Sequence, residues 1–276
     1  YVRFCMTGEY ATEVSDASGM QLLDIPKRQW SDEILEKLDI DKNLLAKVYE
    51  SPEVTGHIND EFAKLSGLST DTVVVGGAGD NAAAAIGTGI VKDGKAFTTI
   101  GTSGVVFAHT DKLSIDPKGR VHTFCCAVPG CWHVMGVTLA AGLSLKWFRD
   151  NIADNYKAKA EELGKDPYVL MNEARGVFFG LSAIHTKENM MRAVMEGVAY
   201  SLSDCYDILK EMGVTVDEMM ACGGGGKSPV WRQMLADMFE CEVKTLTSEE
   251  GPALGVAILA GVGAGIFKDV VSACDE

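Results

Sequence analysis

The sequence predicts an α/β fold, in which helices pack on a central sheet. From about residue 71 onward, short apolar runs alternate with helix-forming stretches, and glycine-rich turns join several of them. This is the pattern of strands and helices packed in layers. The composition is that of a globular protein, with 276 residues of which 47% are hydrophobic and 23% charged. This length allows one large domain or two ordinary ones.

Residues 1–72 are mixed in character and rich in loops. Two helices are expected late in this region, at 31–40 and 58–68, because each stretch opens near Ser, Asn or Asp residues that start helices. Regular alternation of strands and helices begins after this region. We therefore expect two domains, residues 1–72 and residues 73–276.

The second region predicts an ordered series of elements from its apolar spacing and its glycines. Strands are expected at 72–77, on both sides of a turn in 95–110, on both sides of a Pro-Gly turn in 121–138, at 218–222 and at 243–246. Helices are expected at 80–89, 139–156, 186–213, 228–240 and 251–267. Large apolar residues in these helices are expected to pack in the core: Trp147, Phe148, Met190, Met191, Met195 and Trp231.

Charge and cysteine content narrow the range of partners. The formal net charge is -14 and no Lys/Arg cluster stands out, which argues against nucleic acid and anionic membranes as partners. No run is apolar and long enough to span a bilayer. Most of the eight cysteines lie in apolar runs, and this predicts reduced, buried thiols in a cytoplasmic protein.

A zinc site built from neighbouring Cys and His residues is the alternative for some of these thiols. The segment 121–137 favours two strands around a Pro-Gly turn instead, and it contains no C-x-x-C pair. Zinc binding is therefore not expected for this set: Cys125, Cys126, Cys131, His122 and His133.

The most informative segment is GGAGDNAAAAIG, residues 76–87. It follows an apolar run and precedes a small-residue helix, so Asp80 is expected at an exposed strand-to-helix junction with its carboxylate available to a ligand. A helix cap is the alternative role for Asp80. A carboxylate so placed can accept a hydroxyl proton as a phosphoryl group arrives, with Asn81 as a neighbouring polar group.

Two glycine turns further along suggest phosphate binding, and hence an ATP-dependent kinase. In IGTSG, Gly101 and Gly104 allow a tight turn whose N–H groups, with the hydroxyls of Thr102 and Ser103, can face a phosphate. An ordinary hairpin turn is the alternative.

The second turn, ACGGGGKS at 221–228, precedes a helix that Ser228 can cap and Pro229 can begin. Four glycines let a ligand approach the backbone, and the helix N-terminus adds partial positive charge. The turn is not a Walker A motif. A dinucleotide fingerprint fits poorly, since Glu242 precedes the next strand instead of ending it.

Several blocks together resemble the carbohydrate kinases of the FGGY family. The block at 176–197 is similar to the family's C-terminal signature. The residues that match its positions are Gly176, Phe178, Gly180, Leu181, Asn189, Ala193 and Glu196. The other similar blocks are residues 6–20, 76–87, 100–104, 221–243 and 249–261. Asp16 in the first block is a candidate to hold a loop near the site.

The resemblance implies an actin-like architecture of two ribonuclease-H-like domains, which bind ATP with Mg²⁺ and a sugar. It implies phosphorylation of a sugar hydroxyl, with D-xylulose as the favoured acceptor, and it leaves a homodimer open. Asp80 falls on the catalytic base, which also binds the sugar and is expected to contact the metal of Mg-ATP, and Asn81 falls on a sugar-binding position. The nucleotide-binding positions are Gly101, Thr102, Ser103, Gly142, Gly224, Gly225, Gly226 and Ser228.

Two departures from the family pattern qualify this expectation. The family's first phosphate loop and much of its sugar pocket do not occur before Tyr1, and LMNEA at 170–174 runs directly into RGVFFGL, where an omitted loop is expected. The chain alone is therefore not expected to be a competent kinase. The rival interpretations are a kinase for glycerol, gluconate or ribulose, a non-enzymatic actin-like ATP switch, and a dinucleotide-binding oxidoreductase.

Overall fold

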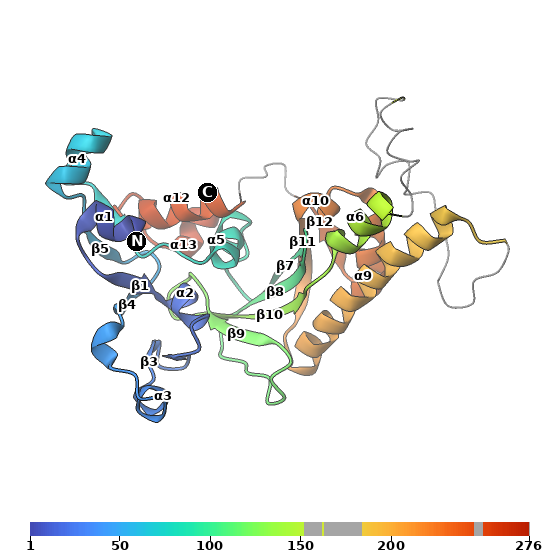
Figure 1. Cartoon of the computed structure of the whole chain (residues 1–276), viewed down its shortest axis with the longest axis horizontal. Helices are drawn as coiled ribbons and strands as arrows, with labels where there is room; N and C mark the ends of the chain where they lie inside the picture. Colours follow the sequence, from blue (N-terminus) through green and yellow to red (C-terminus); the bar gives the residue numbers. More distant parts are fainter. Residues whose placement is uncertain (152–161, 163–183, 246–250, 276) are drawn as a thin grey trace. The chain divides into compact units, whose positions relative to one another are not determined.

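The computed structural model describes residues 1–151, 162, 184–245 and 251–275 (Figure 1). The chain divides into two compact units. Unit 1 comprises residues 1–95, 108–134 and 248–276, and unit 2 comprises residues 96–107 and 135–247. Residue 72 lies inside unit 1, and the predicted domain division at that residue stays a prediction.

The amino-terminal part of unit 1 consists of short elements. Helix starts are capped as the sequence predicts, because Ser31 accepts a hydrogen bond from the Ile34 N–H and Asn59 from the Phe62 N–H. The elements are α1 (Val2–Thr7), β1 (Ala11–Glu13), α2 (Val14–Ser18), β2 (Leu23–Asp24), β3 (Gln29–Trp30), α3 (Asp32–Lys37), η1 (Lys42–Leu44), β4 (Lys47–Tyr49), β5 (Val54–His57) and α4 (Asp60–Ser66).

The strands of this part form two-stranded sheets. Strand β1 pairs with β4 in parallel, and β5 pairs antiparallel with β6 (Val73–Val75). The sequence predicts β6 as a buried strand, but all three of its valines are only half-buried, because β6 belongs to this two-stranded sheet.

The largest sheet has six strands, in the order β12-β11-β7-β8-β10-β9. Its strands lie where the sequence predicts them, with a glycine turn between β7 and β8 and a Pro-Gly turn between β9 and β10. Their bounds are β7 (Gly94–Ile100), β8 (Gly104–Thr110), β9 (His122–Cys125), β10 (Trp132–Thr138), β11 (Val216–Cys222) and β12 (Glu242–Lys244).

Among its described residues, unit 2 contains the helices α6 (Gly142–Asn151), α9 (Lys187–Glu211), α10 (Gly223–Gly226) and α11 (Pro229–Phe239). Met191 and Met195 of α9 are each 1% exposed, and Trp231 of α11 is 3% exposed, so their predicted core role is confirmed. Phe148 is also buried, but Trp147 is 58% exposed. The prediction for Trp147 is wrong because successive residues of a helix point about 100° apart, so Phe148 faces the core while Trp147 faces solvent.

The remaining helices belong to unit 1: α5 (Asp80–Gly87), α12 (Gly251–Gly263) and α13 (Val270–Asp275). Helices α5 and α12 lie side by side (Figure 1), and glycines let their backbones meet. A Cβ on Gly87 would lie 1.8 Å from the Gly251 carbonyl oxygen, and one on Gly255 would lie 1.9 Å from that of Ala83. The glycines of α12 therefore fix the position of α5.

Among the described residues, no helix has the length and apolar character needed to cross a membrane.

Candidate active site

Asp80 is the first residue of α5, and its side chain is exposed. The helix is capped by Gly79 without a side-chain hydrogen bond, so the alternative role of Asp80 as a helix cap is wrong. Its Oδ1 accepts hydrogen bonds from the Asn81 backbone N–H at 2.7 Å and from Asn81 Nδ2 at 3.1 Å. Within the described residues both bonds go to Oδ1, which leaves Oδ2 for a ligand. The predicted exposed junction is confirmed.

A cavity of about 900 Å³ lies beside Asp80, entirely within unit 1. Its lining includes the guanidinium of Arg3 and four acidic residues: Glu9, Glu13, Asp16 and Asp80. Asp16 is exposed there, as its candidate role near the site requires. Asn81 does not line the cavity; it supports the Asp80 carboxylate from beside it. The cavity is large enough for a small polar ligand.

Glu13 is a buried acid that organises the entry to α5, and only 2% of it is exposed. Its carboxylate accepts hydrogen bonds from the N–H groups of Ser15 and Asp16 at 2.7 and 2.6 Å. It also accepts from the hydroxyls of Ser15 and Ser51 at 2.7 and 2.9 Å. Burial raises the pKa of Glu13 above its ordinary value. Ser15 Oγ in turn accepts from the Gly79 N–H at 3.0 Å, so the buried acid positions the residue before Asp80.

Arg3 holds the same turn from the other side. Its guanidinium donates to the Ala11 carbonyl at 2.7 Å and also to the Gly76 carbonyl. Neither Arg3 nor Glu13 is evident from the sequence, because the contacts of Arg3 with Gly76 and of Glu13 with Ser51 join segments far apart in the chain. The only signal was that Glu13 lies in the block 6–20 that resembles the family.

In unit 2, the predicted turn Gly101–Ser103 joins β7 to β8. The Gly101 N–H donates to the Ser103 carbonyl at 3.0 Å, and Thr102 is exposed. Gly142 begins α6 and donates to the Gly101 carbonyl at 2.8 Å. A Cβ on Gly142 would lie 2.5 Å from that oxygen, so only glycine permits this approach. The structure thus brings Gly142 against the first glycine turn.

The four glycines at 223–226 form the short helix α10, not the open turn that the sequence predicts. Gly223 has a φ of 75°, which favours glycine. A Cβ on Gly225 would lie 2.4 Å from Ile100 Cγ2, and one on Gly226 would lie 2.9 Å from the Ala221 backbone. Three of the glycines therefore serve the chain's own packing. Only Gly224 has free space beside it.

A second cavity, of about 580 Å³, brings these turns together within unit 2. Of the predicted nucleotide-binding residues, Ser103 and Gly226 do not line it, and the following do: Gly101, Thr102, Gly142, Gly224, Gly225 and Ser228. Its apolar wall includes Leu143, Met195 and Trp231, and its charged residues are Lys146 and Lys227. An apolar wall with a few polar groups is typical of cofactor-sized sites.

Helix α11 begins as predicted. Ser228 Oγ accepts from the Trp231 N–H at 3.3 Å, and Pro229 occupies the first turn. The Trp231 indole donates to the Met195 carbonyl at 3.0 Å. Trp231, which also lines the cavity, is therefore held in place by this hydrogen bond.

Part of the family-like signature lies outside the described residues: Gly176, Phe178, Gly180 and Leu181, together with the segment 170–174. Its described part opens and stabilises α9. Asn189 Oδ1 accepts from the Thr186 N–H at 2.8 Å in a capping box. Glu196 pairs with Arg192 at 2.7 Å, which is the local pairing expected of a mid-helix acid.

The profiles of one protein family match both ends of the chain. The FGGY family of carbohydrate kinases, N-terminal domain, matches residues 1–87, and the C-terminal domain of the same family matches residues 163–264. The chain therefore belongs to the FGGY family of carbohydrate kinases.

The chain is also similar to individual sugar kinases. The chain is 39% identical over 290 residues to the xylulose kinase of Escherichia coli K12, covering 98% of the chain and 60% of that protein. It is 36% identical to the xylulose kinase of Bacillus subtilis 168, covering 100% of the chain and 59% of that protein. It is also 33% identical to a gluconokinase of Bacillus licheniformis, covering 96% of the chain and 58% of the relative. The chain thus spans about three fifths of the length of these relatives.

Solved structures share the fold. A xyloylose kinase from Brucella ovis matches with a TM-score of 0.87 at 31% identity, over 99% of this chain and 60% of that one. Ligand-bound xylulose kinase from Lactobacillus acidophilus matches with a TM-score of 0.88 at 25% identity, over 100% of this chain and 60% of that one. These matches confirm the predicted α/β, actin-like fold of sugar kinases.

Proposed function

We propose that this chain serves the ATP-dependent phosphorylation of a sugar hydroxyl, with D-xylulose as the acceptor and D-xylulose 5-phosphate as the product. The observation that supports it most is the exposed carboxylate of Asp80, which begins a rigidly placed helix and lines a cavity of about 900 Å³. Because the chain spans about three fifths of its relatives, the activity belongs to the complete polypeptide.

Asp80 acts as the general base in this proposal. Phosphoryl transfer needs little covalent work from a protein, and its main demands are positioned phosphates and a nucleophile whose proton is accepted. Oδ1 is held by two hydrogen bonds from Asn81, so Oδ2 can take the proton of a sugar hydroxyl. Glu13 and Arg3 keep the turn before Asp80 in place.

The cavity of unit 2 is the proposed nucleotide site. Gly224 lets the ligand approach the backbone, while Leu143 and Trp231 offer apolar surface to a base. The turn at Gly101 and Thr102 can offer the hydroxyl of the exposed Thr102 to phosphate oxygens, while the Gly101 N–H is used within the turn.

Magnesium fits the oxygen-rich wall of the other cavity. The carboxylates of Asp16 and Asp80 both line it, and carboxylate oxygens are the ligands that Mg²⁺ prefers. When bound with ATP, the ion neutralises phosphate charge.

We also propose that the protein is cytoplasmic. All eight cysteines are free, which suits the reducing cytoplasm, and we propose a homodimer as the assembly to test.

The deciding experiment measures ADP release by the complete polypeptide with MgATP and D-xylulose, L-ribulose, glycerol or gluconate. We expect turnover selective for D-xylulose, and we expect Asp80→Asn to lower kcat by at least about 100-fold, the usual contribution of a general base. The matched control is Asp71→Asn, an exposed aspartate nine residues earlier, which should keep wild-type turnover.

Other outcomes would redirect the proposal. Selectivity for gluconate would keep the mechanism and change the substrate, as the similarity to a gluconokinase allows. ATP binding without sugar-dependent ADP release, in folded protein, would contradict the kinase and favour an ATP switch.

A further inference from the structure

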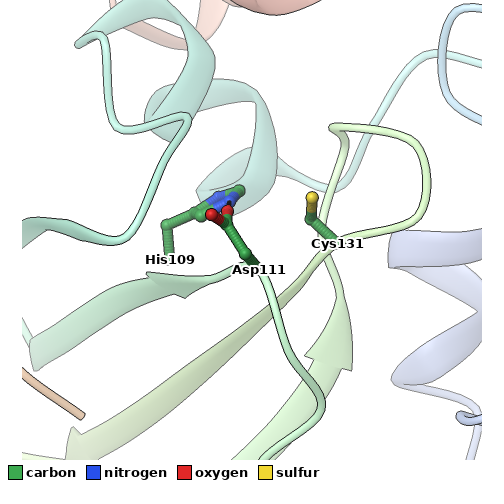
Figure 2. A group of neighbouring side chains, drawn as sticks. All are labelled: His109, Asp111 and Cys131. Carbon is green, nitrogen blue, oxygen red and sulfur yellow. Dashed lines mark hydrogen bonds and ion pairs between the residues drawn. The ribbon is translucent and has the colours of Figure 1, made fainter.

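A cluster of side chains of the kinds that bind metals lies in unit 1, and none of its members lines the Asp80 cavity. His109 belongs to the end of β8, Asp111 follows that strand, and Cys131 precedes β10. The three offer a ring nitrogen, a carboxylate oxygen and a sulfur atom that all lie within 4.8 Å of one another. Figure 2 shows the three side chains converging from two separate segments.

His109 is buried, with 1% of its surface exposed, and both of its ring nitrogens have neighbours. Nε2 lies 3.0 Å from Asp111 Oδ1, and Nδ1 lies 3.8 Å from Cys126 Sγ. A histidine that binds a metal through one nitrogen normally donates the N–H of the other to a partner. The imidazole is therefore supported whichever nitrogen binds the ion.

The backbone on the Cys131 side is fixed. The Cys126 N–H donates to the Cys131 carbonyl at 3.1 Å, and the Cys131 N–H donates to the Val128 carbonyl at 3.2 Å. Arg28 also donates to the Cys131 carbonyl, at 2.9 Å, while it makes two bonds of 2.6 and 2.7 Å to the Glu50 carboxylate.

The Asp111 side is fixed as well, because its N–H donates to Asp93 Oδ1 at 2.7 Å. The ligand positions are thus set before an ion arrives, which lowers the ordering cost of binding.

The mixture of donors selects the class of ion. One nitrogen, one oxygen and one sulfur suit Zn²⁺, whereas Mg²⁺ and Ca²⁺ prefer oxygen ligands only. A water can complete a tetrahedron. The thiolate of cysteine is the form that binds metal, and Cys131 would supply it here.

We propose that His109, Asp111 and Cys131 bind a zinc ion, which ties the end of β8 to the turn before β10. Binding forms a zinc–sulfur bond at Cys131, and any proton still on that sulfur is released to solvent. From the sequence alone, the alternative zinc set combines Cys131 with Cys125, Cys126, His122 and His133. The structure supplies different partners, because strand pairing brings β8 and the β9–β10 turn together.

The test uses the untagged chain, stripped of metal by a chelator and then titrated with Zn²⁺ and Co²⁺. We expect one equivalent of Zn²⁺ at about micromolar Kd or tighter. The Co²⁺ form should show a thiolate-to-metal charge-transfer band and the intense visible bands of a tetrahedral site. Asp111→Asn should weaken Zn²⁺ binding about 10- to 100-fold, and Cys131→Ser should abolish the charge-transfer band.

Cys5→Ser is the matched control, because Cys5 is an exposed thiol of the same unit and its loss should change neither stoichiometry nor spectrum. Zinc binding weaker than about 100 μM, or a cobalt spectrum without sulfur charge transfer, would overturn the proposal. Because these two measurements use the wild-type chain, they test the proposal even if a variant fails to fold. An unchanged cobalt spectrum in folded Cys131→Ser would also overturn it.

Discussion

At the scale of single residues, Glu13 shows how a buried acid can serve an exposed one. Four hydrogen-bond donors converge on its carboxylate, and one of them, Ser15, also holds the Gly79 N–H. The exposed Asp80 needs no buried network of its own because Glu13 fixes the turn that carries it.

Replacing Glu13 by Gln should lower stability in a pH-dependent way. The NH2 group of Gln cannot accept hydrogen bonds, so some of the donors around position 13 would lose their acceptor. We therefore expect a loss of about 1–3 kcal/mol in the free energy of unfolding at pH 5. The pKa of Glu13 is raised above its ordinary 4.5, so the folded state holds this proton more tightly than the unfolded state. Wild-type stability therefore falls as the pH rises from 4.5 through the folded pKa, while Gln does not titrate.

The difference between wild type and Glu13→Gln should consequently narrow from pH 5 to pH 8, as measured by urea unfolding. Glu33→Gln is the control, since the Glu33 side chain is 76% exposed, and its effect should be small at every pH. A difference that widens with pH would contradict the prediction, because it would show that the four hydrogen-bond donors lower the pKa of Glu13 more than burial raises it.

At the scale of elements, helix α12 determines where α5 lies. Gly255→Ala would place a Cβ 1.9 Å from the Ala83 carbonyl oxygen. This oxygen belongs to the backbone of α5, so it cannot move away without shifting the helix. We expect a loss of about 1–3 kcal/mol or more from overpacking, measured by thermal and urea unfolding. Because α5 carries Asp80, kcat of the complete polypeptide should fall with it.

The matched control for Gly255→Ala is Gly197→Ala in α9. Gly197 has no atom within 4 Å of a built Cβ, so the same substitution should stabilise the helix by up to about 1 kcal/mol. Equal effects at the two positions would show that the α5–α12 contact does not limit stability.

The sequence predicted these elements well where a local signal exists. Apolar runs gave the strands of the large sheet, and Ser228 with Pro229 gave the start of α11, because both signals act within a few residues. The helical form of Gly223–Gly226 was not predictable, since it depends on contacts with Ile100 and Ala221.

The candidate site was predictable in the same uneven way. The exposed Asp80 follows from an apolar run that meets a helix. The roles of Glu13 and Arg3, and the cluster around His109, depend on partners far along the chain, which one sequence cannot reveal.

At the scale of the whole molecule, the net charge of -14 opposes the approach of an anionic nucleotide. The two lysines of the unit 2 cavity, Lys146 and Lys227, attract it at short range. Ionic strength decides which field dominates, because the Debye length is about 30 Å at 0.01 M and about 8 Å at 0.15 M. At low salt the repulsion of many surface carboxylates reaches the site, whereas at physiological salt only nearby charges do.

We therefore expect nucleotide binding to strengthen as salt rises from about 10 to 150 mM, with Kd for MgADP falling by about threefold. Isothermal titration with KCl as the added salt measures this directly. Lys146→Ala should weaken binding at both salt concentrations and leave the direction of the salt effect unchanged. Weaker binding at 150 mM than at 10 mM would mean that the cavity's own lysines outweigh the field of the whole chain.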